Sequence, residues 1–236
     1  LMEKQIKSID RVKSHGEVFT PLPTVKLMLN QPEIQVKIKD LSATFLVPAA
    51  GEGAFLIELL KRKMNVAQEK SKNFKEYDYN VLLALSSLYG IELLSDNLRR
   101  LRLNMNVVFK NTYQKGMDSY NKEVNKNVLK SAQVIIEANM VQGDTLKRKK
   151  NDGSPIILSE WEQLPKKYGI KKIRRVEYTF DSIVKGEDKP LYERKDKLKQ
   201  LDLFNLDANV SDKDNSKYKF KDVRFDEVYK ELKEKI

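Results

Sequence analysis

The 236-residue sequence contains no cysteine and only one histidine. The absence of cysteine excludes disulfides, thiolate catalysis and cysteine-ligated zinc. A single histidine argues against histidine-based metal centres and against Ser/His/Asp triads. No apolar run approaches the ~20 residues of a membrane span, and the N-terminal LMEKQIKSIDR lacks the apolar core of a signal peptide. We therefore expect no metal, no membrane partner and a cytoplasmic location.

Acidic residues are fewer than basic ones: Asp and Glu number 34 against 45 Lys and Arg, which gives a net charge of +11. Such an excess favours a polyanionic partner, because each phosphate contact releases counterions. A lysine-rich solvated surface with no such partner explains the charge equally well. Charge alone leaves both interpretations open.

The most informative stretch is FLVPAAGEGAFLIEL at residues 45–59. An apolar run is followed by a proline and small residues, and a helical apolar face then begins at Phe55, which predicts a strand, a tight turn and a helix. Gly51 and Gly53 allow positive φ and a close approach of the backbone to a ligand. The following helix directs its free N–H groups at that ligand. The stretch by itself predicts a phosphate-like or nucleotide-like ligand at the start of that helix.

Apolar segments alternate with helical patterns along the rest of the chain. This alternation favours an α/β fold, a doubly wound and mostly parallel sheet with ligands at the carboxyl ends of its strands. The predicted strands are residues 44–47, 88–93, 138–141, 155–158 and 175–184.

We expect a cofactor-binding domain at residues 1–184 and a lysine-rich extension at residues 185–236. Beyond Lys185 the composition changes to Lys, Asp and Glu with isolated apolar residues, which predicts helices or partial disorder. Near the end, Phe225, Val228, Tyr229 and Leu232 follow helical spacing and predict a final docked helix.

Polar side chains follow the predicted strands where a doubly wound fold would bring them together. Glu92 ends the second strand and Asp144 follows the third. A carboxylate ending the second strand typically accepts two hydrogen bonds from ribose hydroxyls. Ser159, Glu160 and Trp161 follow the predicted fourth strand and offer a hydrogen-bond acceptor beside an aromatic ring.

Four segments together resemble the ordered motifs of N6-adenine DNA methyltransferases, including modification subunits of restriction systems. They are GEVFTP at 16–21, VPAAGEGAF at 47–55, YGIEL at 89–93 and VQGDTL at 141–146. The resemblance covers roughly residues 8–160. It implies the class I S-adenosylmethionine-dependent methyltransferase fold, and the sequence leaves open whether the sheet reaches the usual seven strands.

The resemblance also implies an S-adenosylmethionine pocket. In it, Thr20 would lie near the cofactor carboxylate, Glu92 would hold the ribose hydroxyls and Asp144 would meet the adenine amino group. For Phe19 and Phe55, core packing explains the residue as well as ligand contact does. The residues implied to bind the cofactor are Phe19, Thr20, Pro21, Pro48, Ala49, Gly51, Gly53, Phe55, Glu92, Leu93, Asp144 and Thr145.

The chain departs from the family's pattern in three places. Val47 stands where the family usually has an acid, and Glu52 and Ala54 replace residues that are often neutral or Asn. The catalytic tetrapeptide, Asn or Asp followed by Pro-Pro and an aromatic residue, is absent, since the sequence contains no Pro-Pro. In the family this segment holds a flipped base. Ser159, Glu160 and Trp161 are the candidates for that place, with packing of Trp161 as the alternative.

Two functions follow from this pattern. The first is an S-adenosylmethionine-binding DNA adenine-N6 methyltransferase-like protein, with DNA and a specificity or other restriction–modification subunit as partners. The second is a non-catalytic protein of the same fold, either a regulatory subunit or a phage-type anti-restriction factor that binds DNA or protein. A dinucleotide oxidoreductase ranks below both, because Leu56 stands where GxGxxG requires its third glycine.

Overall fold

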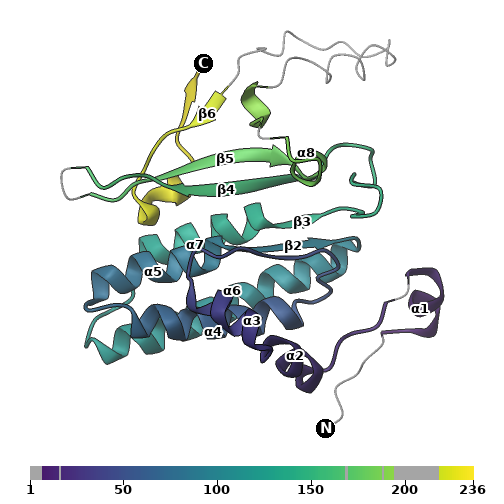
Figure 1. The fold of residues 1–236 in the computed structure, drawn as a ribbon, viewed down its shortest axis with the longest axis horizontal. Helices are drawn as coiled ribbons and strands as arrows, with labels where there is room; N and C mark the ends of the chain where they lie inside the picture. The colour runs from purple at the N-terminus through teal and green to yellow at the C-terminus, as the bar shows by residue number, and fades with distance from the viewer. Residues whose placement is uncertain (1–6, 16, 168–169, 188, 194–217) are drawn as a thin grey trace.

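The computed structural model describes residues 7–15, 17–167, 170–187, 189–193 and 218–236 (Figure 1). Its helices are α1 (Ile9–His15), α2 (Leu22–Leu29), α3 (Pro32–Lys39), α4 (Ala54–Glu69), α5 (Phe74–Ser86), α6 (Ser95–Ser119), α7 (Lys126–Asn139) and α8 (Phe180–Val184), with the 3-10 helices η1 (Leu191–Glu193) and η4 (Phe225–Lys230). Its strands are β1 (Phe45–Val47), β2 (Leu88–Glu92), β3 (Met140–Gln142), β4 (Ile157–Gln163), β5 (Ile173–Thr179), β6 (Tyr218–Phe220) and β7 (Lys233–Lys235).

The first three strands form a parallel sheet in the order β1-β2-β3. Val47 is in register with Gly90 and Glu92 with Gln142, so the carboxyl ends of the strands meet at one edge of the sheet. This confirms an α/β fold and the first three predicted strands. The helical connections between them follow the rule that parallel strands need crossover segments.

The fourth and fifth strands do not continue this sheet, so the prediction of a mostly parallel arrangement is wrong for them. β4 and β5 pair with each other as an antiparallel hairpin, in which Ile157 lies opposite Thr179 and Gln163 opposite Ile173. The sequence pattern indicated two strands here, but alternation of apolar residues does not determine the partner of a strand.

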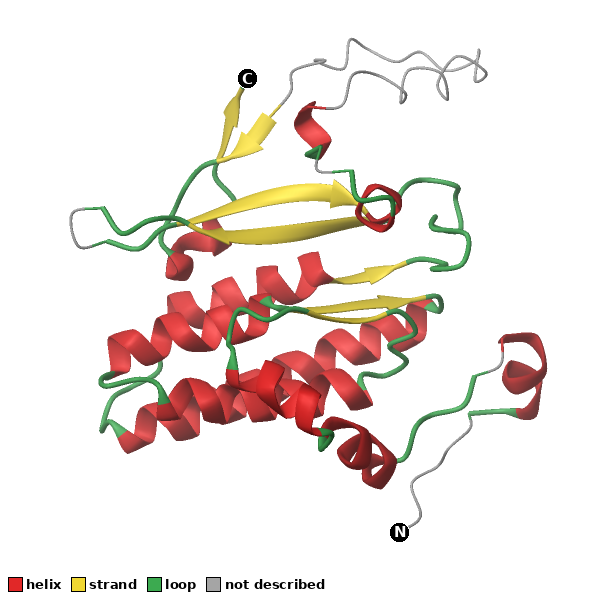
Figure 2. Ribbon diagram, in the orientation of Figure 1, coloured by secondary structure: helices red, strands yellow, loops and turns green. Residues whose placement is uncertain are grey.

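The parallel sheet lies between helices on one side and the β4–β5 hairpin on the other (Figures 1 and 2). On the helix side, Gly90 permits close packing: a Cβ there would lie 2.7 Å from Leu56 Cδ1 of α4. On the other side, Ile91 and Val141 pack with Ile156, Leu158 and Phe180 in a small buried cluster. Each face of β2 therefore contributes to a different core.

The two long helices beside the sheet have the expected apolar spacing. α4 buries Leu56, Leu59, Leu60, Met64 and Ala67, and α6 buries residues at the same three- and four-residue intervals. α6, with 25 residues, is the longest helix in the described part of the chain. Among the described residues, no helix is both long enough and apolar enough to cross a membrane.

Two helices begin in polar segments of the sequence. Pro32 stands in the first turn of α3, where proline is a favourable helix start. At the start of α5, Asn73 accepts hydrogen bonds from the amides of Lys75 and Glu76, at 3.1 Å each, and Glu76 accepts one from the Lys72 amide. This reciprocal capping begins the helix.

The predicted extension at 185–236 lies partly outside the described residues, which omit 188 and 194–217. The final segment forms a 3-10 helix, η4, between strands β6 and β7 rather than the α-helix that we predicted. Phe225 and Val228 are buried in the main core, and the Tyr229 amide donates to Ser131 of α7. Docking of this end is therefore confirmed, and the domain boundary at 184/185 stays a prediction.

Candidate active site

The glycine turn connects β1 to α4 at the carboxyl edge of the parallel sheet. Gly51 has φ of 56° and Gly53 has φ of 100°, both in the left-handed region that favours glycine. The turn is fixed by hydrogen bonds from Ala50 N to Ile91 O and from Gly53 N to Ala50 O, each 3.0 Å. Gly53 is also the N-cap of α4. The predicted strand, turn and helix are therefore confirmed.

Glu92, at the end of β2, reaches across to this turn. Its Oε2 accepts a hydrogen bond from the Gly51 amide at 2.7 Å, and its Oε1 accepts one from the Leu94 amide at 3.0 Å. The Glu92 side chain is buried, with 6% of its surface exposed. The structure thus brings together the two features that the sequence analysis singled out first, the glycine turn and the acid after the second strand.

The segment before α2 lies on the outer side of the turn. A Cβ at Gly51 would lie 3.5 Å from Phe19 Cδ1, in ordinary van der Waals contact. Thr20 and Pro21 follow in partly exposed positions, and Pro21 O accepts the Val25 amide at the start of α2. Gly16, the first residue of the GEVFTP segment, lies outside the described residues.

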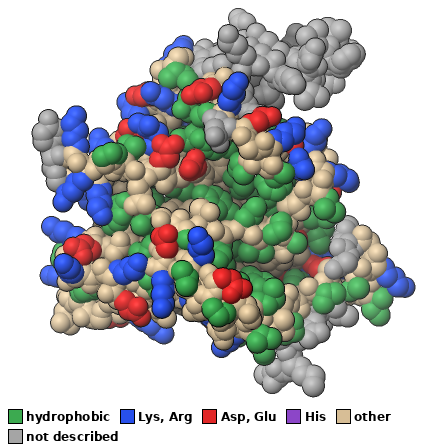
Figure 3. Space-filling view, in the orientation of Figure 1, with side chains coloured by type: hydrophobic (Ala, Val, Ile, Leu, Met, Phe, Trp, Pro, Cys, Tyr) green, Lys and Arg blue, Asp and Glu red, His purple; other side chains and the backbone are tan. Residues whose placement is uncertain are grey.

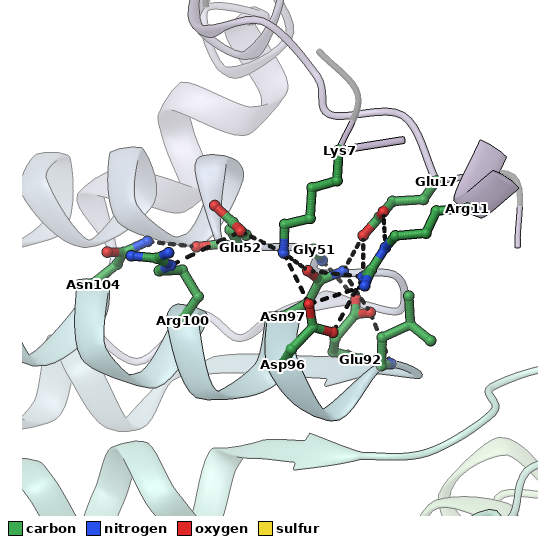
Figure 4. Close-up of polar contacts among 11 residues, drawn as sticks. Lys7, Arg11, Glu17, Gly51, Glu52, Glu92, Asp96, Asn97, Arg100 and Asn104 are labelled. Carbon is green, nitrogen blue, oxygen red and sulfur yellow. Dashed lines mark hydrogen bonds and ion pairs between the residues drawn. The ribbon is translucent and has the colours of Figure 1, made fainter. Parts of the chain in front are cut away.

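A polar network joins this N-terminal segment to the site (Figure 4). The guanidinium of Arg11 contacts Glu17 and Asp96, with Nη1 3.0 Å from Asp96 Oδ2. Asn97, which is buried, donates to Glu17 Oε1 at 2.5 Å and lies 3.3 Å from Glu92 Oε1. Asn97 therefore links the segment before α2 to the Glu92 carboxylate at the end of β2.

Acidic and basic side chains of this network are paired with one another. Hydrogen bonding to Arg11 lowers the pKa of Asp96 to about 2, and contact with the same guanidinium lowers the pKa of Glu17. Glu52, one of the departures from the family pattern, forms an ion pair with Lys7 at 2.7 Å. The negative charge of Glu52 in the turn is thus paired with the positive charge of Lys7, which precedes α1.

Asp144 lies in the loop after β3, as predicted, but its carboxylate is directed to its own loop. Oδ1 accepts the amides of Leu146 and Lys147, each at 3.0 Å, and the backbone hydrogen bond from Lys147 lowers the pKa of Asp144. The next residue reaches the turn: Thr145 Oγ1 donates to Pro48 O at 3.1 Å.

The remaining predicted cofactor residues surround the turn. Leu93 is half-buried, and its carbonyl accepts a hydrogen bond from Gln142 Nε2 at 3.1 Å. Ala49 is exposed, and Phe55 packs partly buried against the main core at the start of α4. The contact of Phe55 agrees with the core-packing interpretation.

Ser159, Glu160 and Trp161 lie in the middle of β4 and not at the end of a parallel strand, so their expected position is wrong. Trp161 is buried, and its Nε1 donates to Asn139 Oδ1 at 2.9 Å. Ser159 is 2% exposed, and its Oγ accepts a hydrogen bond from Arg175 Nε at 3.0 Å. The Glu160 side chain is exposed. The structure therefore gives Trp161 a packing and anchoring contact.

Three residues of the site were not among the predicted ones: Arg11, Glu17 and Asn97. Glu17 belongs to the GEVFTP segment, and Asn97 stands in the first turn of the helix that follows Glu92. The only signal in the sequence for the contact between Asn97 and Glu92 is their separation by five residues. One of the two acidic partners of Arg11, Asp96, lies 85 residues away, and no local pattern indicates that contact.

The site can accept a polar ligand through a defined set of groups. An ionised carboxylate offers about four acceptor positions, and Glu92 uses three of them, for the Gly51 amide, the Leu94 amide and Asn97. The left-handed glycines leave the backbone side of the turn without side chains. These features fit the ribose and methionine portions of S-adenosylmethionine, whereas the Asp144 carboxylate would have to turn from its loop to meet adenine.

Within the described ranges, no group of three or more His, Cys, Asp or Glu side chains is arranged to hold a metal ion. Comparison with known proteins finds no matching protein-family model, no matching curated protein and no matching solved structure.

Proposed function

We propose that this protein binds S-adenosylmethionine and functions as a DNA adenine-N6 methyltransferase-like protein of a restriction–modification system. The observation that carries the proposal is the contact between Glu92, at the end of β2, and the amide of Gly51 in the glycine turn. The acceptor position that remains on this buried carboxylate, beside a turn with two left-handed glycines, suits a ribose hydroxyl of a nucleoside. The motif resemblance and the net charge of +11 support the same assignment.

In this proposal each part of the site has a role. Glu92 accepts a ribose hydroxyl at the one acceptor position that its contacts to Gly51, Leu94 and Asn97 leave over. The turn from Pro48 to Gly53 lies along the methionine portion, and Phe19 covers the turn. S-adenosylmethionine would supply an activated methyl group. The N-terminal segment would exclude water from the cofactor, because Arg11, Glu17 and Asn97 connect it to the site. DNA, a specificity subunit and a cytoplasmic location remain parts of the proposal.

A second candidate is a non-catalytic protein of the same fold that acts by binding DNA or protein. The observation in its favour concerns Ser159 and Trp161, the residues that we placed at the acceptor site. Both are buried in the β4–β5 hairpin and hydrogen-bonded to Arg175 and Asn139. In this candidate the glycine turn and Glu92 hold the cofactor for regulation or are a remnant of a former active site.

Calorimetric titration of the full chain with S-adenosylmethionine tests the cofactor site. We expect binding, and we expect Glu92→Gln to weaken it by on the order of tenfold to a hundredfold, since a hydrogen bond to a charged group is lost. Glu69→Gln is the matched control, because Glu69 is an exposed acid at the end of α4. Equal affinity of the two variants would refute the role of Glu92.

Transfer of labelled methyl groups separates the two candidates. The first predicts label on adenine of DNA when the protein is supplied with S-adenosylmethionine and its partner subunits. The second predicts cofactor binding or DNA binding without transfer. Label on adenine that disappears in Glu92→Gln would reject the second candidate.

A further inference from the structure

A groove lies at the opposite end of the sheet from the glycine turn. The carboxyl ends of β2 and β3 point toward the side where α1 lies, and the β4–β5 turn lies at the other end (Figure 1). The groove has a volume of about 880 Å³. It is bounded by the start of α5, by Lys166, Ile170 and Lys171 of the connection between β4 and β5, and by η4.

The walls of the groove carry an excess of cations. They include Lys70, Lys75, Lys166, Lys171 and Arg224. In the space-filling view, Lys and Arg side chains gather at this end of the molecule, around the β4–β5 turn (Figure 3). Lys75 and Lys166 are exposed and form no ion pair with any residue that the structure describes. Their charges are available to an anion.

The three acids of the groove are already engaged within the protein. Glu76 accepts the Lys72 amide at the start of α5, and Asp226 forms two hydrogen bonds with Arg224. Asp78 accepts from the Tyr113 hydroxyl and from Asn125 Nδ2, and its burial raises its pKa. With the Arg224–Asp226 pair set aside, four lysines of the groove stand against Glu76 and Asp78, so the groove keeps an excess of positive charge.

Aromatic rings lie among these cations. Tyr79 is half-buried, packs edge-on against Phe225 with ring centroids 5.5 Å apart, and donates from its hydroxyl to Gln163 at 3.0 Å. Its ring is thus held in place from two sides. Lys171 Nζ lies 4.5 Å from the centre of the same ring. A planar group that stacks on Tyr79 would displace an exposed lysine, whose ammonium would then be available for a phosphate.

We propose that this groove binds a single strand of nucleic acid. Phosphates would contact Lys75, Lys166 and Lys171, and a base would stack on Tyr79. Cationic grooves with fixed aromatic rings bind single strands in this way, because every base has a face that can stack. A duplex suits the groove less well, since its bases are paired and stacked on one another. This site is separate from the glycine turn, so the proposal does not depend on cofactor binding.

Fluorescence anisotropy of a labelled oligodeoxythymidylate of about 12 nucleotides tests the groove in the full chain. The test variant carries Lys75→Gln, Lys166→Gln and Lys171→Gln, all at exposed positions. The control carries Lys26→Gln, Lys61→Gln and Lys110→Gln, which make the same change in net charge on exposed positions of α2, α4 and α6 outside the groove.

The test variant should lose affinity strongly. Counterion release contributes about fivefold per contact at 0.1 M salt, so three lost contacts should weaken binding on the order of a hundredfold and reduce the salt slope by about 2. The control should lose far less. Oligonucleotide binding of the unchanged protein should also fall by about fivefold or more when the strand is abasic, because stacking is lost.

Several results would overturn the proposal. One is equal affinity of the test and control variants, and another is equal affinity for the abasic strand. A duplex that binds more tightly than the single strand through the same lysines would contradict it as well. Binding of poly-glutamate with equal affinity would point to an acidic protein segment instead. Calorimetry with S-adenosylmethionine on the test variant should be unchanged, so the groove and the cofactor site can fail separately.

Discussion

The two ends of the parallel sheet are built differently. At the carboxyl end, the site is formed mainly by backbone groups. The turn contains two left-handed glycines, and the amides of Gly51 and Leu94 donate to Glu92. At the opposite end, the groove is formed by side chains from α5, the β4–β5 turn and η4. The first end is a short continuous segment plus one acid, whereas the second assembles residues that lie far apart along the chain.

This difference determines what each end can bind. The glycine turn presents fixed amides and a buried carboxylate, which select a ligand with defined hydroxyl and carboxylate groups. The groove presents flexible lysines beside a fixed ring, which suit a repeated charge more than one particular shape. The ends should therefore respond differently to substitution: the turn to backbone strain, and the groove to loss of charge.

The largest expected effect is that of Gly51→Val on the turn. Valine at φ of 56° is strained, and its methyl groups would extend toward Phe19, which already lies 3.5 Å from the position of a Cβ. We expect S-adenosylmethionine binding to fall below detection by calorimetry, while oligonucleotide binding at the groove is retained.

Gly153→Val is the matched control for this substitution. Gly153 also has a positive φ, of 81°, but no atom lies within 4 Å of the position of its Cβ. It therefore carries the same kind of backbone strain without the contact to Phe19. Loss of cofactor binding in Gly153→Val to the same extent would show that strain in general, and not the turn, is responsible.

The same contrast explains how much the sequence could predict. The turn at 45–59 was predicted because a strand, glycines and a helix follow one another within one segment, and Glu92 was identified because it ends an apolar run. The contact between Gly51 and Glu92 itself depends on the parallel register of β1 and β2, in which Val47 lies opposite Gly90, and the structure supplies that register.

The opposite end could not be predicted in this way. Lys75, Lys166 and Lys171 look like ordinary surface lysines in the sequence, and only the fold brings them to one groove. The antiparallel pairing of β4 with β5 was missed because an isolated alternating segment does not specify its partner. Burial of Trp161 depends on Asn139 in another element, which the sequence does not connect with it.

The next effect in size concerns Asn139, which joins the hairpin to the sheet. This fully buried side chain donates to the carbonyls of Ser86 and Leu88, each at 3.0 Å, and accepts from Trp161. Asn139→Leu preserves the shape but leaves buried groups unpartnered, at about 1–3 kcal/mol for each. We expect urea unfolding to show a loss of about 3 kcal/mol or more.

Trp161→Phe gives the comparison for this prediction, because it removes a single donor of the same cluster. It should cost less than Asn139→Leu, and the double variant should cost less than the sum, since the two side chains share one hydrogen bond. Oligonucleotide binding at the groove should weaken in Asn139→Leu more than cofactor binding does. If the losses of unfolding free energy in the two single variants added up fully in the double variant, Asn139 and Trp161 would not stabilise the hairpin through a shared hydrogen bond.

The smallest expected effect is release of the N-terminal segment by acid. The pKa of Asp96 is lowered to about 2 and that of Glu17 is also lowered, in both cases by Arg11. These lowered pKa values belong to the state in which the N-terminal segment lies over the turn. A carboxylate with a lowered pKa stabilises that state fully above its ordinary pKa, near 4, and the contribution is lost as the pH falls through the lowered value. Hydrogen exchange of residues 7–20, corrected for intrinsic rates, should therefore increase between about pH 4 and pH 2.

The change should be modest because Asp96 is half-exposed, and Arg11→Gln should exchange fast at both pH values. An exchange rate in the unchanged protein that is constant over this range would show that the ion pairs do not hold the segment over the turn.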